Sequence, residues 1–139
     1  MKILLAVDGS QFTQRMTNYL ASHAWLTSGN TFTVLYTVLP VPHRAAAFVG
    51  LDTVKLYYAD DARVVLDPVR EFLQSHGVQA EYVHKVGHPA EEIARYADQH
   101  GFDLVMMGSH GHGLLTNLVM GSVATKVLAQ CKVPLLLVR

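Results

Sequence analysis

Five short apolar runs that alternate with segments of helical spacing constrain the fold of this chain most tightly. The first run, residues 3–7, is continuous, which is typical of a strand buried on both faces of a sheet. Asp8 and Gly9 follow as a turn signal, and Ser10 is a good N-cap for a helix expected over residues 11–28. The opening segment therefore predicts a buried strand, a tight turn and a helix.

The later runs continue the same alternation. Strands are predicted near residues 31–38, 80–86, 103–107 and 134–138, and helices near 53–76, near 89–100 and before residue 130. Residues 40–52 have mixed composition and no clear period, so we expect a loop there. Pro68 removes an N–H donor inside the long second helix, which should bend or restart near that residue.

Alternating strands and helices predict one doubly wound α/β domain over residues 1–139. Parallel neighbours need crossover connections, so a parallel sheet with helices on both faces is expected. A chain of 139 residues, half of them apolar, can bury one core and is too short for two ordinary domains. In such sheets ligands bind beyond the carboxyl ends of the strands, where the strand order reverses.

Composition narrows the classes of partner. The 11 basic residues balance 11 acidic ones and form no basic run, which argues against nucleic acid and against an anionic membrane surface. Cys131 is the single cysteine, so an internal disulfide and a multi-cysteine metal site are excluded, as expected in a reducing compartment. The apolar run over residues 3–7 is shorter than a signal sequence or a membrane span requires. A cytoplasmic protein is expected.

The one glycine-dense stretch, residues 108–113, starts where the fourth strand is expected to end. Leu114 and Leu115 stand where a P-loop needs lysine and serine or threonine, so that motif fails. The dinucleotide fingerprint fails as well, because Thr116 replaces its third glycine. Neither a P-loop NTPase nor a nicotinamide enzyme is supported.

A cradle of backbone N–H groups remains as the interpretation of this stretch. Glycines let the main chain approach an anion closely, and Gly121 with Ser122 opens a helix whose free N–H groups favour negative charge. Ser122 is expected as the N-cap, and its hydroxyl is expected as a possible hydrogen-bond donor to phosphate. The alternative is that the glycines only shape a tight loop and that Ser122 only caps the helix.

This glycine spacing resembles the nucleotide-binding signature of the universal stress protein family. That signature is Gly-x2-Gly-x9-Gly followed by serine or threonine, and it stands here as Gly108, Gly111, Gly121 and Ser122. Similar segments cover most of the chain: residues 3–10, 87–93, 103–111 and 133–138. The resemblance implies a universal stress protein domain over residues 1–139, with an adenine nucleotide alpha hydrolase-like, Rossmann-like sheet in the order 3-2-1-4-5.

The resemblance also implies a nucleotide site. The adenine would lie between the first two strand ends, where the backbone near Ala6 and of Thr37 meets the base, with Asp8 near the ribose or a divalent ion. Ribose and phosphates would be held by the loop and the following helix start: Gly108, Ser109, His110, Gly111, His112, Gly113, Gly121, Ser122 and Val123. Asp8 can alternatively form only a turn with Gly9.

The loop histidines have alternative interpretations. His110 and His112 can donate to phosphate oxygens or can simply be exposed. Together with His88 they suggest a metal site, but no carboxylate or cysteine partner is set by spacing, so no metal ligand is assigned.

The function expected from the resemblance is binding of ATP, with or without Mg²⁺, as a regulatory ligand in a stress response. No lysine, arginine finger or evident general base accompanies the loop, so no catalytic residue is assigned and little or no hydrolysis is expected. The alternatives are a slow ATPase, an adenylyl-transferring enzyme, or an interaction module with an empty site. The last strand lacks protective charges, so a homodimer through residues 133–138 is predicted, beside an unknown downstream protein partner.

Overall fold

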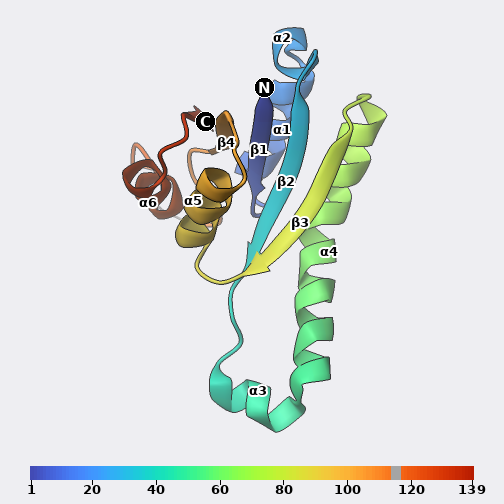
Figure 1. Ribbon diagram of the computed structural model, residues 1–139, viewed down its shortest axis with the longest axis vertical. Coiled ribbons are helices and arrows are strands. Elements are labelled where there is room, and N and C mark those ends of the chain that lie inside the picture. Colours follow the sequence, from blue (N-terminus) through green and yellow to red (C-terminus); the bar gives the residue numbers. More distant parts are fainter. Residues whose placement is uncertain (114–116) are drawn as a thin grey trace.

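Five parallel strands form one sheet in the computed structural model, which describes residues 1–113 and 117–139. The strands are β1 (Lys2–Val7), β2 (Thr31–Val38), β3 (Ala80–Val86), β4 (Leu104–Gly108) and β5 (Leu135–Val138). Their order is β3-β2-β1-β4-β5, and every neighbouring pair is parallel. Figure 1 shows β1 between β2 and β4. The predicted doubly wound sheet in the order 3-2-1-4-5 is confirmed.

Helices cover both faces of this sheet. The first face packs against α1 (Gln11–Ala21), α2 (Ala24–Thr27) and α4 (Leu51–Ser75), and the second against α5 (Pro89–Gln99) and α6 (Ser122–Gln130). Along β1, Ile3 and Leu5 pack in the first core and Leu4 in the second, and all three are fully buried. Because both faces of β1 are covered, the run needs no polar residue.

The helix predicted over residues 11–28 is divided. It ends as α1 at Ala21, and the short α2 follows after a break at Ser22 and His23. The hydroxyl of Ser22 donates to the Asn18 oxygen at 2.8 Å, and His23 Nδ1 lies 2.7 Å from the Tyr19 oxygen. These side chains bond to carbonyl oxygens of the last turn of α1, which ends the helix earlier than its apolar spacing indicates.

The segment expected as a loop over residues 40–52 contains a helix, α3 (His43–Val49). None of its residues is buried, which explains why its sequence carries no apolar period. Gly50, with φ of 88°, separates α3 from α4 in a backbone conformation that glycine adopts without strain. Figure 1 shows α3 and the first turns of α4 projecting beyond the sheet.

Of the predicted bend or restart at Pro68, the restart is wrong, because α4 is one helix that contains this proline, and the bend stays a prediction. The missing N–H of Pro68 removes one helical hydrogen bond. Leu66, Val69 and Leu73 are buried against the sheet on either side of it. Packing of these side chains compensates for the lost bond and keeps the helix continuous.

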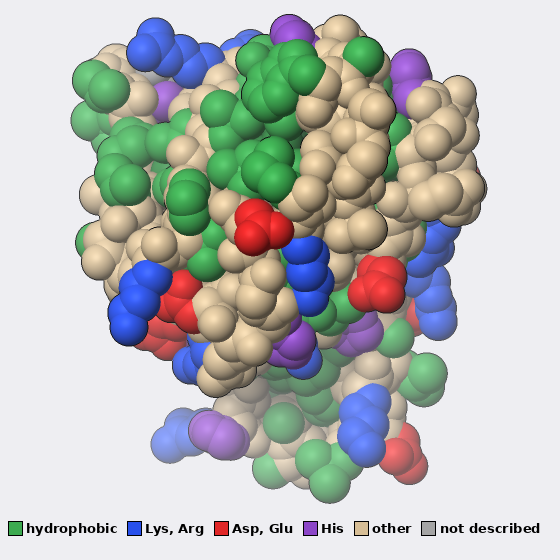
Figure 2. Space-filling view, turned by 45° about the horizontal axis from the view of Figure 1, so that its top comes forward, with side chains coloured by type: hydrophobic (Ala, Val, Ile, Leu, Met, Phe, Trp, Pro, Cys, Tyr) green, Lys and Arg blue, Asp and Glu red, His purple; other side chains and the backbone are tan. Residues whose placement is uncertain are grey.

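The surface carries no large field of one sign on the face that Figure 2 presents. Basic and acidic side chains are interspersed there, and hydrophobic side chains gather in its upper part. Within the described residues, no helix is both long and apolar enough to cross a membrane.

Candidate functional site

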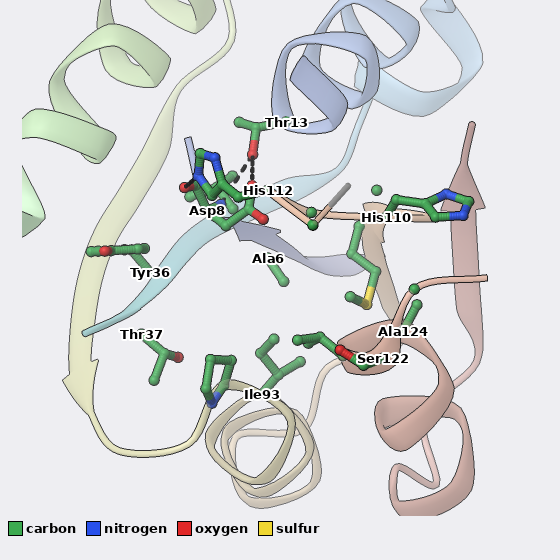
Figure 3. Close-up of a pocket in the computed structure, with 18 of the residues that line it drawn as sticks. Ala6, Asp8, Thr13, Tyr36, Thr37, Ile93, His110, His112, Ser122 and Ala124 are labelled. Atoms are coloured by element: carbon green, nitrogen blue, oxygen red, sulfur yellow. Dashed lines mark hydrogen bonds between the residues drawn. The ribbon is translucent and has the colours of Figure 1, made fainter. Parts of the chain in front are cut away.

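A pocket of about 430 Å³ opens at the carboxyl ends of β1, β2 and β4. The strand order reverses there: the chain places β2 and β3 on one side of β1, and then β4 and β5 on the other side. Figure 3 shows its residues arranged around a common space. Of the predicted site residues, all except Ser109 line this pocket: Ala6, Asp8, Thr37, Gly108, His110, Gly111, His112, Gly113, Gly121, Ser122 and Val123. Ser109 is buried beside it.

The turn after β1 is held by a closed set of hydrogen bonds. Asp8 Oδ1 accepts from the Ser10 N–H at 2.9 Å and from the Thr13 hydroxyl at 3.0 Å. Thr13 Oγ1 in turn accepts from the N–H groups of Asp8 and Gly9, at 3.0 and 3.2 Å. One carboxylate oxygen of Asp8 therefore makes the predicted turn, and Oδ2 faces the glycine loop.

Three glycines of the signature stand where a side chain would collide. A Cβ at Gly108 would lie 2.5 Å from the Phe12 Cβ, and one at Gly111 would lie 2.6 Å from Asp8 Oδ2. At Gly121 the nearest atom would be the His110 Cα, at 3.0 Å. The close approach of Phe12, of the Asp8 carboxylate and of the His110 backbone therefore favours glycine at these three positions, as the alternative of a tight loop predicts. The same three glycines and Asp8 also line the pocket.

The start of α6 differs from the prediction in one respect. Gly121, and not Ser122, is the N-cap, so the prediction that Ser122 caps the helix is wrong. The Gly121 N–H donates to the Ser109 oxygen at 2.7 Å, and the helix begins at Ser122, one residue earlier than expected. No side chain caps the first turn, and Ser122 and Val123 line the pocket. The uncapped N–H groups of this turn are suited to an anion.

Both loop histidines contact main-chain oxygens. His112 Nε2 lies 2.7 Å from the Asp8 oxygen, and His110 Nε2 lies 2.7 Å from the Leu118 oxygen. The other ring nitrogen of His110 lies 2.9 Å from the Ser109 hydroxyl. The imidazoles thus hold the loop in place, and their donation to phosphate stays a prediction. Among the described residues, no group of three or more His, Cys, Asp and Glu side chains converges to hold a metal ion.

Sequence reasoning missed much of the apolar wall. Leu39, Pro89, Ile93, Met107 and Ala124 also line the pocket. Leu39 and Met107 lie at strand ends, where a ligand is expected, but their side chains look like ordinary core residues in the sequence. The pocket consequently has an apolar part and a polar part, the latter formed by the Asp8 turn and the glycine loop.

Tyr36 was missed as well and connects the pocket to α4. Its hydroxyl donates to Asp61 Oδ2 at 2.9 Å. Burial, and then this bond to a carboxylate, raises the pKa of Tyr36 to about 12. Among the described residues that line the pocket, no lysine or arginine occurs, so an anion there would be met by backbone N–H groups and the α6 dipole.

A doubly wound sheet with a pocket at its switch point, walled by a glycine loop and an uncapped helix start, defines a class of small α/β ligand-binding domains. Residues 1–139 match the sequence model of the universal stress protein family. This chain belongs to that family.

Sequence relatives include universal stress proteins of bacteria. Universal stress protein YxiE of Bacillus subtilis is 28% identical over 146 residues, covering 99% of this chain and 98% of YxiE. A universal stress protein of Thermus aquaticus is 32% identical over 140 residues, covering 99% of this chain and 97% of the relative. Universal stress protein Slr1230 of Synechocystis is 30% identical over 138 residues, 99% of this chain, but the chain spans only 42% of its length.

Solved structures show the same fold. MJ0577 of Methanocaldococcus jannaschii superimposes with a TM-score of 0.81 at 25% identity, covering 99% of this chain and 94% of that protein. The Archaeoglobus fulgidus protein in complex with dAMP has a TM-score of 0.71 at 22% identity, covering 100% and 98%. An Arabidopsis thaliana protein with AMP bound has a TM-score of 0.68 at 14% identity, covering 99% and 90%. At 22% and 14% identity, the similarity to the Archaeoglobus and Arabidopsis proteins shows a shared fold and nothing more.

Proposed function

We propose that this protein binds an adenine nucleotide, with ATP as its physiological ligand, and acts as a regulatory binding protein of a cytoplasmic stress response with little or no hydrolysis. One observation carries the proposal: the separated parts of the glycine signature meet around one pocket that also contains Ala6, Asp8 and Thr37. The dAMP and AMP held by the Archaeoglobus and Arabidopsis proteins support it.

The apolar part of the pocket suits a flat base. Ala6, Met107 and Ile93 present small or flexible apolar groups to the pocket. Ligand pockets of several hundred Å³ commonly combine such a wall with a few polar groups that orient the ligand. The base would lie against this wall, with the backbone of Thr37 at its edge.

The polar part suits the ribose and phosphates. The uncapped start of α6 at Ser122 and the N–H groups of residues 110–113 supply positive ends of dipoles without a cationic side chain. Asp8 Oδ1 is engaged in the turn, so Oδ2 is the oxygen that fits a magnesium ion carried in with ATP. Such an ion would neutralise phosphate charge that the backbone alone leaves uncompensated.

Binding without appreciable turnover is favoured by what the described pocket residues can do. Phosphoryl transfer needs positive groups on the transferred phosphate and a group that orients the nucleophile. The pocket lining includes neither lysine nor arginine among the described residues, and Nε2 of each loop histidine already contacts a carbonyl oxygen. A slow ATPase, an adenylyl-transferring enzyme and a nucleotide-free interaction module are the other outcomes that the experiment below distinguishes.

A second copy of this chain is the proposed protein partner. β5 is an edge strand, and its four residues are all partly exposed. An apolar edge invites pairing with another chain, so we propose a homodimer through residues 133–138.

The test combines native mass spectrometry of the purified protein with calorimetric titration of ATP and AMP, each with and without Mg²⁺. A co-purified adenine nucleotide or saturable ATP binding supports the proposal. Release of ADP or AMP and pyrophosphate at a catalytic rate would favour an enzyme instead. If neither nucleotide binds, the nucleotide-free interaction module is the remaining alternative.

A further inference from the structure

The hydroxyl of Thr37 is a buried polar group without a partner. Thr37 is only 7% exposed, and its Oγ1 has no hydrogen bond to any residue that the structure describes. Among the described residues, the other buried side-chain oxygen without a hydrogen-bond partner is the Tyr82 hydroxyl. Tyr82 does not line the pocket. Buried hydroxyl groups are nearly always bonded, because burying one unpaired costs free energy. Because Thr37 lines the pocket, its hydroxyl is placed to form a hydrogen bond with a bound ligand.

The main chain of Thr37 adds a second group at the same place. β1 pairs with β2 only as far as Val7 opposite Tyr36, so Thr37 extends past the end of β1. The next residue, Val38, has its carbonyl directed to β3, where it accepts from the Gly87 N–H at 2.9 Å. Peptide groups alternate in direction along a strand, so the carbonyl of Thr37 is directed to the opposite side, where β1 has ended.

The turn after β1 removes the donor that would continue the ladder. In a parallel pair continued by one more step, the Gly9 N–H would donate to the Thr37 oxygen. That N–H instead donates to Thr13 Oγ1 at 3.2 Å. The Thr37 carbonyl consequently receives no bond from β1. An acceptor and a hydroxyl of the same residue are thus presented to the pocket together.

Figure 3 shows the Thr37 side chain at the end of β2, with its oxygen directed to the part of the pocket where Ile93 lies. The hydroxyl of Tyr36, the preceding residue, donates to Asp61 and is therefore not free to bond a ligand. Thr37 therefore brings a free, buried side-chain hydroxyl to the apolar part of the pocket.

We infer that the Thr37 hydroxyl reads the base of the ligand and selects a 6-aminopurine. The Thr37 carbonyl accepts from the exocyclic amine, and Oγ1 donates to a ring nitrogen beside that amine. A 6-oxopurine would place its own oxygen against the Thr37 carbonyl, which repels it, so guanine and hypoxanthine are disfavoured. This inference rests on the proposed function and assigns the base specificity of that site to a side chain.

The first test is calorimetric titration of AMP and IMP into the wild type, Thr37→Val and Thr37→Ser. Valine keeps the shape of the side chain and removes the hydroxyl, so AMP affinity should fall about tenfold, whereas serine keeps the hydroxyl and most of the affinity. The wild type should bind AMP more tightly than IMP, and Thr37→Val should reduce that preference. A wild type that binds no AMP overturns the proposed function as well. Equal AMP affinities in the wild type and Thr37→Val overturn this inference alone.

The second test asks whether the hydroxyl contacts the base. In 1-deaza-AMP and 7-deaza-AMP, a CH group replaces the ring nitrogen on one or the other side of the amine. One analogue should bind the wild type about tenfold more weakly than AMP, and this penalty should disappear in Thr37→Val. If both analogues show the same penalty in the two proteins, Oγ1 does not read the base.

Thermal unfolding separates this role from a structural one. Without nucleotide, Thr37→Val should melt at or above the temperature of the wild type, because a methyl group replaces an unpaired buried hydroxyl. With saturating AMP the order should reverse, because the wild type gains more from the ligand. A nucleotide-free Thr37→Val that melts well below the wild type would show that Oγ1 is bonded within the protein, and would overturn the inference.

Discussion

His112 Nε2 lies 2.7 Å from the main-chain oxygen of Asp8, although the two residues are 104 positions apart. The contact fastens the loop after β4 to the turn after β1, and both residues line the pocket. A carbonyl oxygen can only accept a hydrogen bond, so this contact requires the form of the His112 ring that carries a hydrogen atom on Nε2. One imidazole thus sets the position of the loop that is proposed to hold the phosphates.

Removing this imidazole should weaken nucleotide binding. His112→Ala loses a hydrogen bond worth about 1 kcal/mol net, so AMP affinity measured by calorimetry should fall between about threefold and tenfold. His112→Gln is the matched control, because its amide N–H can reach the same carbonyl oxygen and should restore part of the affinity. Unchanged AMP affinity in His112→Ala would show that the loop keeps its position without the contact.

Gly121→Val should abolish nucleotide binding and leave the protein folded. The Cβ of valine would lie 3.0 Å from the His110 Cα and 3.2 Å from the Ser109 oxygen, so the start of α6 must shift away from the loop. Circular dichroism checks the fold and calorimetry with ATP and Mg²⁺ checks binding. Leu128→Val is the control, because Leu128 is 56% exposed on α6 and does not line the pocket. Binding by Gly121→Val equal to the wild type would exclude the α6 start from the site.

Ser122→Ala should weaken ATP binding and leave stability nearly unchanged. Ser122 is not the N-cap, so the stability loss expected for removing a cap does not apply. Loss of one hydrogen bond from a neutral hydroxyl to an ionised phosphate corresponds to an affinity lower by about tenfold to about a hundredfold. Titration calorimetry and thermal unfolding together measure both effects. A large drop in melting temperature with unchanged affinity would contradict this assignment.

Tyr36 should titrate at higher pH than an ordinary tyrosine. Burial and the bond to Asp61 raise its pKa to about 12, so the folded state holds this proton more tightly than the unfolded state, whose pKa is about 10. The resulting stabilisation is present below pH 10 and is lost as the pH rises from about 10 to about 12. Burial also raises the pKa of Tyr82 and of Tyr96, so ultraviolet absorbance titration should show one fewer late-titrating phenol in Tyr36→Phe than in the wild type, with the exposed Tyr57→Phe as control. A Tyr36→Phe variant with as many late-titrating phenols as the wild type would refute the assignment.

Leu136→Lys should convert the proposed homodimer into a monomer. A charge on the edge strand β5 opposes pairing with a second chain. Multi-angle light scattering at micromolar concentration measures the state, and Val64→Lys, at a position 74% exposed on α4, is the control. Leu136 also packs partly against the core, so the melting temperature of the variant must be checked. A wild type that is already monomeric would rule out this interface.

Much of the fold followed from local patterns in the sequence. A continuous apolar run such as residues 3–7 requires two covered faces, and alternation with helices requires crossovers, so a parallel sheet was predictable. The strand order and the site residues came from the glycine spacing and the family resemblance that it carries. Helix α3 was not predictable, because none of its residues is buried and no apolar period marks it.

The sequence by itself determined which segments become strands, where the chain must turn, and which glycines let the backbone come close. Only the tertiary structure decided which polar groups find partners. His112 meets Asp8 across 104 residues, and Gly121 replaces Ser122 as the cap of α6. Thr37 keeps an unpaired hydroxyl in the pocket, and its carbonyl receives no bond from β1 because the Gly9 N–H donates to Thr13. Apolar burial depends on the local pattern of residue types, whereas a hydrogen bond requires two groups to meet at a defined distance and angle, which distant segments set together.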